Sequence, residues 1–220
     1  MRAFLFLFFV IFGFCNLSAQ ERFLMPADEA KNDASFFVFR TKLIEAAKKR
    51  DAKYVLSILD RNITNNFGGD GGIEDFKDLW KIHRSDSEFW REFLLVITNG
   101  GKFNNEDNRK IFYAPYTFAS FPDDLDSFTF SVIFGDKVNV RSSADAKSPV
   151  VGSLSYNIVE ILKTIREENN AEKISWYKIK TLGGKTGFVK AEFARSPTDY
   201  RAGFEKKNGK WKMTAFIAGD

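Results

Sequence analysis

Cysteine and histidine, the side chains that most often serve as nucleophile, general base or zinc ligand, are almost absent from this chain. The single cysteine is Cys15, inside the apolar start of the sequence, and the single histidine is His83. A catalytic zinc typically takes three protein ligands, and a cysteine nucleophile needs a base beside it. Because His83 falls between Trp80 and Ser85, at the expected end of a helix, a solvated or cap-associated imidazole is the simplest interpretation. The sequence therefore predicts no metal site and no cofactor.

A pair of carboxylates can hydrolyse a glycan without cysteine or histidine. The candidates in the front half are Glu74, Asp75 and Glu88. The first two fall in the expected first turn of a helix, where the helix dipole favours acidic residues, and Glu88 completes a Ser-x-x-Glu capping box with Ser85. These structural roles account for all three, so we expect no enzyme. A carboxylate-dependent glycan hydrolase stays as an alternative.

A set of aromatic and basic side chains in the back half is better suited to binding than to catalysis. Aromatic rings offer a flat apolar shelf, and arginine and lysine attract carboxylates. The candidate ligand-binding residues are Arg141, Tyr156, Trp176, Tyr177, Lys185 and Phe188. Because side chains alternate along a strand, Trp176 and Tyr177 point to opposite faces, so at most one of them lines a groove and the other is core.

The chain starts with the features of an export signal. Arg2 precedes an unbroken apolar run over residues 4–14, and small and polar residues follow up to Gln20. This arrangement predicts a signal peptide over residues 1–19, removed near Ala19, and a periplasmic or secreted protein. The run is well short of the roughly 20 residues that a membrane-spanning helix needs, and no later segment approaches that length. We therefore expect no transmembrane segment in the mature chain.

Cys15 offers an alternative to ordinary cleavage, because a cysteine that ends an apolar run can be the lipidated first residue of a lipoprotein. Lipoprotein signals have a small residue just before the cysteine, whereas Phe14 stands there in this chain. Cleavage near Ala19 is therefore favoured. It leaves a mature chain without cysteine and hence without a disulfide.

Charge is divided unevenly along the chain. Residues 20–129 contain 16 lysines and arginines against 19 acidic residues, and residues 130–220 contain 16 against 10. Outside the cytoplasm a basic surface has cell-wall polymers, lipid head groups or an acidic protein as its expected partners, and nucleic acid is not expected. A solvated surface that keeps the protein soluble is the alternative meaning of the excess.

Apolar residues recur at helical spacing through the front half. The pattern predicts a helix from Ser35 to the basic residues near 50, and a shorter one capped by Asp51 that contains Ile58 and Leu59. Two more helices are expected over residues 73–82 and 89–97, the last ended by Asn99 and two glycines. Residues 102–127 are expected to form loops. The interpretation is a mainly helical N-terminal domain over residues 20–128.

From Phe128 the apolar period changes to two. The expected strands are residues 128–134, 137–141, 158–165, 176–181 and 187–189, which suit a small barrel over residues 129–197. Asn208-Gly209 predicts a two-residue hairpin turn within residues 198–220. Pairing around this turn gives one apolar face, formed by Tyr200, Ala202, Phe204, Met213, Ala215 and Ile217. The hairpin packs on either the barrel or the helical domain, and the fold class is α+β.

Residues from about 130 to 197 resemble the bacterial SH3 (SH3b) family. Val138-Asn139-Val140-Arg141 is similar to its opening strand, and Gly187-Phe188-Val189 to its closing Gly-Trp-Val. Residues 151–154, 159–162 and 176–179 match the strands between them in order. Phe188 replaces the usual tryptophan, and a polar insertion at residues 166–173 separates two strands.

The resemblance implies an SH3-like β-barrel that is an accessory unit and binds peptidoglycan, another wall component or sometimes a protein. The leading expectation is therefore an exported, non-catalytic protein that recognises cell-wall (peptidoglycan) material through this barrel. An envelope protein–protein interaction adaptor is the alternative. The resemblance implies nothing about the N-terminal helical domain.

Overall fold

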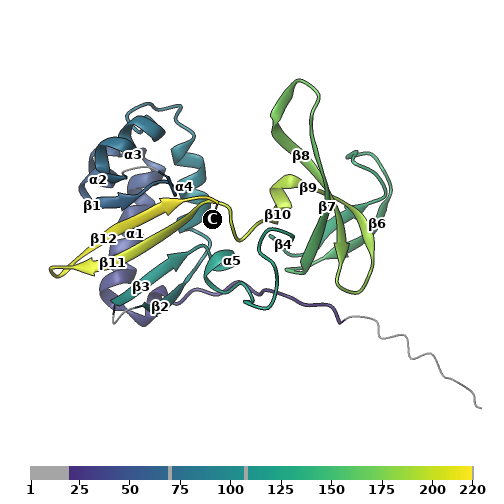
Figure 1. Ribbon diagram of the computed structural model, residues 1–220, viewed down its shortest axis with the longest axis horizontal. Helices are drawn as coiled ribbons and strands as arrows, with labels where there is room; N and C mark the ends of the chain where they lie inside the picture. Colours follow the sequence, from purple (N-terminus) through teal and green to yellow (C-terminus); the bar gives the residue numbers. More distant parts are fainter. Residues whose placement is uncertain (1–19, 69–70, 107–108, 220) are drawn as a thin grey trace, which may run out of the picture.

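The computed structural model describes residues 20–68, 71–106 and 109–219, which form two units side by side (Figure 1). The expected signal peptide, its cleavage site at Ala19 and Cys15 all lie outside the described residues. The protein is α+β, and its two units have separate hydrophobic cores. None of the helices in the described ranges is long and apolar enough to cross a membrane.

The first unit is a five-stranded sheet with helices packed against it. The strands lie in the order β1-β12-β11-β3-β2, and all neighbours are antiparallel except β1 and β12. The strands are β1 (Leu59–Thr64), β2 (Lys102–Glu106), β3 (Arg109–Ala114), β11 (Arg201–Lys207) and β12 (Lys210–Ile217). The helices are η1 (Ala30–Asn32), α1 (Ala34–Lys48), α2 (Ala52–Ser57), α3 (Gly72–Trp80), α4 (Phe89–Ile97) and α5 (Tyr116–Ala119).

The helices α1 to α4 follow the sequence pattern, but residues 20–128 also contribute three strands, β1, β2 and β3, to a sheet. Residues 102–106 and 109–114, expected as loops, form the paired strands β2 and β3. Leu59, expected in the second helix, begins β1 opposite Met213. A short apolar run does not distinguish a helix end from a strand. Here the distant partner strand β12 decides the conformation.

Local hydrogen bonds fix where the helices begin. Asp33 caps α1 by accepting from the backbone N–H groups of Ser35 and Phe36, each at 3.0 Å. Asp51 caps α2 as expected, accepting from Tyr54 at 3.0 Å. The capping box with Ser85 does not form, because Ser87 accepts from the Phe89 N–H at 3.2 Å and donates to the Trp80 carbonyl at 2.6 Å.

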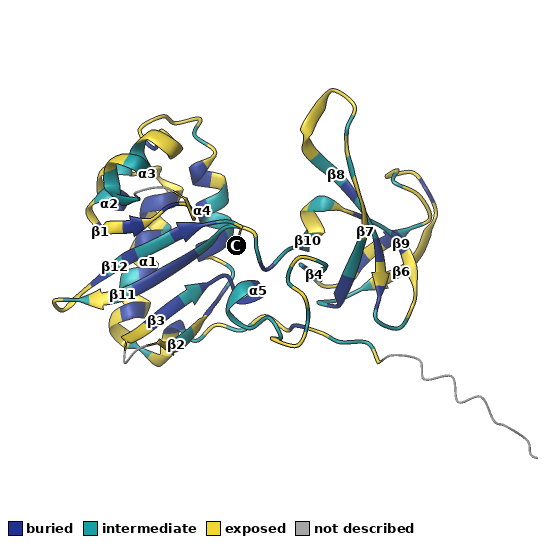
Figure 2. Ribbon diagram, in the orientation of Figure 1, coloured by how far each residue is buried: buried dark blue, intermediate teal, exposed yellow. Residues whose placement is uncertain are grey.

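Phenylalanine fills the space between the sheet and the helices. Phe36 of α1 lies with its ring centroid 4.3 Å from that of Phe112 and 4.8 Å from that of Trp211. A second group joins α4 to β12 through Phe93 and Phe216, 5.4 Å apart. Figure 2 shows buried residues along the central strands of this sheet. Nine of the 19 phenylalanines in the described residues belong to this core or pack against it.

The C-terminal hairpin belongs to the first unit, where it supplies the second and third strands of the sheet. Its turn is at Asn208-Gly209, as expected, with φ of 50° and 76°. Phe204 pairs with Met213 in the expected register, but a β-bulge then leaves Thr214 unpaired and places Phe216, not Ala215, opposite Ala202. Because of the bulge, the phenyl ring of Phe216 occupies the core position where the methyl group of Ala215 was expected.

The second unit is a curled seven-stranded sheet in the order β10-β4-β7-β8-β9-β5-β6. Its elements are β4 (Phe130–Ile133), β5 (Val138–Arg141), β6 (Val150–Leu154), β7 (Ile158–Glu167), β8 (Asn170–Thr181), β9 (Thr186–Lys190), η2 (Ala191–Phe193) and β10 (Ala194–Arg195). Ile133, Val138, Val140, Val159, Ile179 and Val189 form its core. We call this unit the barrel.

The polar insertion at residues 166–173 extends β7 and β8 instead of separating them with a loop. The two strands continue to pair as far as Glu167 and Asn170. In Figure 1 this long hairpin rises away from the rest of the barrel. Most residues of the insertion are exposed, so they add little to the barrel core.

Residues 20–29, which we call the strap, run along both units. The Arg22 carbonyl accepts from the Ile158 N–H at 2.9 Å, and the Leu24 N–H donates to the Tyr156 carbonyl at 2.8 Å. Further along, the Ala27 carbonyl accepts from the Gly101 N–H at 2.9 Å. Leu24 also joins Tyr116 of the first unit and Val132 and Ile158 of the barrel in a small shared core. The strap therefore links the units by backbone hydrogen bonds and by apolar contact.

Candidate functional site

Strand β8 sends alternate side chains to the inside and the outside of the barrel. Tyr177 is half-buried against the core, and the desolvation there raises the pKa of its hydroxyl. Trp176 points the other way and belongs to none of the hydrophobic clusters, although only 9% of it is exposed. The two side chains therefore point to opposite faces of the strand, as expected, and Trp176 is the one on the outside of the barrel.

Trp176 lines a hollow on the outside of the barrel, which we call the outer groove. Its volume is about 310 Å³, at the small end of the range for ligand pockets. The groove is bounded by β5, β8, β9 and the helical turn η2. Besides Trp176, its lining includes Asp136, Lys137, Arg141, Lys190, Glu192 and Phe193.

Arg141 is held in place at the end of β5. Its guanidinium donates to the Ser148 carbonyl at 2.6 Å. Ser148 is itself buried, and its hydroxyl is within hydrogen-bond distance of the carbonyls of Ser143, at 3.1 Å, and Asp145, at 2.8 Å. A guanidinium carries five N–H donors, so this anchor leaves others for a ligand.

A glycine allows β5 to cross close to β9 and complete the groove. A Cβ atom on Gly187 would lie 2.3 Å from Val140 Cγ1 and 3.1 Å from the Arg141 carbonyl oxygen. The neighbouring residue Phe188 pairs with Arg141. Only a residue without a side chain fits this crossing, which gives the glycine of the Gly-Phe-Val sequence a physical reason.

The outer groove contains basic groups that are not neutralised within the protein. Lys190 lies 3.4 Å from the Glu192 carboxylate, and Asp136 accepts from Ser155 at 2.6 Å. Among the described residues, neither Lys137 nor Arg141 has a carboxylate partner. The groove therefore combines an indole surface with two cationic groups, an arrangement that suits a ligand with a carboxylate beside an apolar part.

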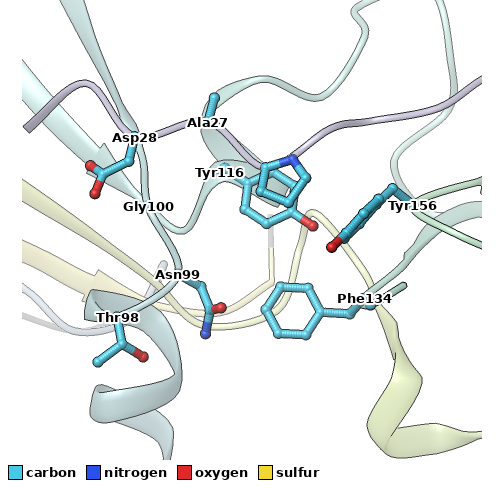
Figure 3. Close-up of a pocket in the computed structure, with 10 residues that line it drawn as sticks. Ala27, Asp28, Thr98, Asn99, Gly100, Tyr116, Phe134 and Tyr156 are labelled. Carbon is cyan, nitrogen blue, oxygen red and sulfur yellow. The ribbon is translucent and has the colours of Figure 1, made fainter. Parts of the chain in front are cut away.

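The six candidate ligand-binding residues do not form one shelf. Arg141 and Trp176 line the outer groove, and Phe188 is next to Arg141 in the strand pairing. Tyr177 packs on the core, and Lys185 lines a different hollow at one end of the barrel. Tyr156 lies in a cavity between the two units (Figure 3). The curvature of the sheet separates these residues. A period-two pattern predicts which side chains share a face of a strand, but it does not predict how the sheet curves.

Sequence reasoning missed other residues of these cavities. Lys137 and Phe193 line the outer groove. Lys137 lies within the expected strand 137–141, and Phe193 follows the expected strand 187–189 by four residues. Tyr116 and Phe134 line the cavity between the units. Their signal was weak, because both fall in a region rich in aromatic residues, where burial is the ordinary explanation.

The acidic candidates for glycan hydrolysis have other surroundings. Glu74 forms an ion pair with Lys77 at 2.7 Å, and Asp75 accepts from Asn65 at 3.1 Å. Glu88 lines a separate hollow beside Trp80. His83 is exposed, and within residues 20–68, 71–106 and 109–219 no group of three or more potential metal ligands occurs.

Comparison with known proteins identifies the barrel. Residues 136–194 match the family model of the bacterial SH3 domain, which confirms the resemblance seen in the sequence. A search of curated proteins found no match to the chain. The matched segment spans β5 to η2 and contains Trp176 and Arg141, whereas the first unit lies outside it. Residues 136–194 of this α+β protein are a bacterial SH3 domain.

Proposed function

We propose that this protein is exported, has no catalytic activity of its own, and binds peptidoglycan through the outer groove of its SH3 domain. Bacterial SH3 domains commonly bind cell-wall material. The expected signal peptide favours a location in the periplasm or outside the cell, where the wall is accessible.

The observation that supports the proposal most is that Trp176 and Arg141, whose guanidinium is anchored to Ser148, line the same groove. Wall peptides present carboxylates on a chain with aliphatic parts. The carboxylate suits the guanidinium, and the aliphatic part suits the indole surface. Lys137 adds a second cation without a carboxylate partner among the described residues.

The test is co-sedimentation of residues 20–220 with purified peptidoglycan over a series of salt concentrations. We expect retention that decreases as salt rises, because salt screens the exposed cations. Trp176→Ala and Arg141→Gln are expected to reduce retention at low salt at least about fivefold, as loss of about 1 kcal/mol of binding energy predicts.

Lys185→Ala is the matched control, because Lys185 is an exposed cation at another place on the barrel. It removes the same kind of charge and is expected to leave retention nearly unchanged. Equal loss in Lys185→Ala and Arg141→Gln would indicate a general charge effect and contradict a specific groove. Absence of retention at every salt concentration would contradict the proposal as a whole.

An envelope protein partner is the second candidate, favoured by strand β6. This strand is last in the order of the barrel sheet, and its Val150 and Val151 are 50% and 58% exposed. An exposed edge strand with apolar side chains can pair with a strand of another protein. Recovery of one stoichiometric partner, lost on Val151→Lys, would support this function.

A further inference from the structure

A second cavity lies where the two units and the strap meet, and we call it the junction pocket. Its volume is about 350 Å³. Ala27 and Asp28 of the strap, the turn Thr98–Gly100 after α4, and Tyr116 at the start of α5 form one side. Phe134, Gly135 and Tyr156 of the barrel form the other (Figure 3). The pocket is distinct from the outer groove, with which it shares no lining residue.

Backbone contacts fix the wall of the pocket on the side of the first unit. A Cβ atom on Gly100 would lie 2.1 Å from the Ala27 carbonyl oxygen, so a glycine is needed for the strap to come this close. The Asn99 carbonyl accepts from the Tyr116 N–H at 3.0 Å, which ties α5 to the same turn. This side of the pocket is therefore preformed.

Three aromatic rings surround the space. Tyr116 and Phe134, from different units, have nearly parallel rings at 11° with centroids 5.9 Å apart. The hydroxyl groups of Tyr116 and Tyr156 point toward one another in Figure 3. Tyr116 is only 2% exposed, yet within the described chain its hydroxyl has no hydrogen-bond partner. This hydroxyl is therefore available to a ligand, and a hydrogen bond to it contributes about 0.5–1.5 kcal/mol.

The remaining polar groups are neutral or already paired. Asn99 donates through its side-chain nitrogen to the Leu95 carbonyl at 2.7 Å, which leaves its side-chain oxygen as an acceptor. Asp28 is the one charged residue of the lining, and the Arg40 guanidinium binds its carboxylate with one bond at 2.8 Å and a second, shorter bond. The pocket therefore offers no cation for a phosphate or carboxylate and no free carboxylate for a cation.

We propose that the junction pocket binds one neutral pyranose unit of a glycan. The C–H face of a sugar ring packs on aromatic rings, and its hydroxyl groups suit the Tyr116 and Tyr156 hydroxyls and the Asn99 amide. We take the glycan to be that of the cell wall, which consists of N-acetylhexosamine units, and this identification rests on the proposed function. In that case the two cavities bind different parts of one polymer, the peptide in the outer groove and the sugar at the junction.

The test is calorimetric titration of residues 20–220 with a tetramer of N-acetylglucosamine, which carries no peptide and no charge. We expect saturable binding that is weakened about fivefold by Tyr116→Phe, since the change removes one hydroxyl and about 1 kcal/mol. Tyr156→Phe is expected to act in the same direction. Both variants keep the ring, and Tyr156 is only half-buried, so at least one of them should fold. Lys185→Ala, which lies in neither cavity, is the control and is expected to leave tetramer binding unchanged.

Absence of saturable binding overturns the inference. A second contrary result is tetramer binding that stays unchanged in both tyrosine variants but is lost in Trp176→Ala. The two proposals fail in different ways. If peptidoglycan is retained through Trp176 but the tetramer does not bind, the junction pocket is not a sugar site. If the tetramer binds and depends on Tyr116 while peptidoglycan is not retained, the sugar site stands and the wall-binding function fails.

Discussion

At the scale of single residues, closure of the barrel depends on the absence of one side chain. Gly187 lies on β9 where Val140 of β5 crosses, and a Cβ there would be 2.3 Å from Val140 Cγ1. Gly187→Ala is therefore expected to destabilise the protein by about 1–3 kcal/mol, the usual cost of an added methyl group in a packed interior. Urea unfolding followed by tryptophan fluorescence measures this change.

Gly152 of β6 provides the matched comparison, because no atom lies within 4 Å of the place its Cβ would occupy. Gly152→Ala is expected to change the free energy of unfolding by no more than about 0.5 kcal/mol. Equal destabilisation by the two substitutions would show that the close crossing at Gly187 is not the cause.

A second residue-scale prediction concerns acid. Asp33 caps α1, and its hydrogen bond with Ser35, the Phe36 N–H and nearby Lys110 lower its pKa from 3.8 to about 2. The lowered pKa means that the carboxylate contributes its full stabilisation above about pH 4, and that this contribution is lost as the pH falls through about 2. Asp33→Asn should therefore lower the unfolding free energy by about 0.5–1 kcal/mol at pH 6 and by almost nothing near pH 2.

The measurement is the urea midpoint of the parent and of Asp33→Asn at several pH values. Asp78→Asn, at an exposed position of α3, controls for the change in net charge. If the difference between parent and Asp33→Asn persists undiminished at pH 2, the stabilisation does not come from the ionised carboxylate.

At the scale of elements, structure was predictable where the interactions that decide it are local. The Asn208-Gly209 turn and the cap at Asp51 depend on residues a few positions apart, and both are present. Strand β1 depends on pairing with β12 at the other end of the chain, and helical spacing around Ile58 concealed it. The bulge at Thr214 was equally inaccessible, because strand alternation assumes an uninterrupted register.

The candidate site follows the same rule. Alternation was enough to separate Trp176 from Tyr177, because it acts within one strand. It was not enough to place Tyr156, which has a positive φ of 59° in a turn and faces the other unit. The junction pocket combines five segments distant in sequence, near residues 27, 99, 116, 134 and 156, so no local pattern contains it.

The long β7–β8 hairpin gives a prediction at this scale. Its outer part, residues 166–173, is mostly exposed, whereas Val159 and Ile179 are buried in the barrel core. We expect amide hydrogens of the outer part to exchange at least about tenfold faster than those of Val159 and Ile179, because local opening exposes no core there. Hydrogen exchange by NMR tests this, and equal protection along both strands would show that the whole hairpin opens only with the barrel.

At the scale of the whole molecule, the SH3 domain is inserted into the first unit. The chain leaves that unit before the barrel and returns to it for β11 and β12. The two ends of the insertion are close together, since the Ser196 hydroxyl is 3.4 Å from the Ser127 carbonyl oxygen. This arrangement divides the charge of the basic back half. Residues 136–194 contain ten basic and seven acidic residues, and residues 195–220, which include the C-terminal hairpin of the first unit, contain six basic and three acidic residues.

The insertion predicts opposite outcomes for two deletions. Replacing residues 128–197 by a short Gly-Ser linker should leave a first unit that unfolds cooperatively, because its main core contains no residue of the barrel. Removing residues 198–220 should abolish its folding, although the deletion is much smaller. That deletion takes away two strands of the sheet and the core side chains of Phe204, Met213 and Phe216.

Near-ultraviolet circular dichroism and urea unfolding distinguish these outcomes. The first deletion should keep the aromatic signal of the phenylalanine and tryptophan core, with some loss of stability from the missing contact of Leu24 and Tyr116 with the barrel. The second should retain at most the signal of the barrel around Trp176. A cooperative transition of the first unit without residues 198–220 would mean that the remaining strands can close its core alone. That result is hard to reconcile with a sheet in which β1 has β12 as its partner and β11 lies between β12 and β3.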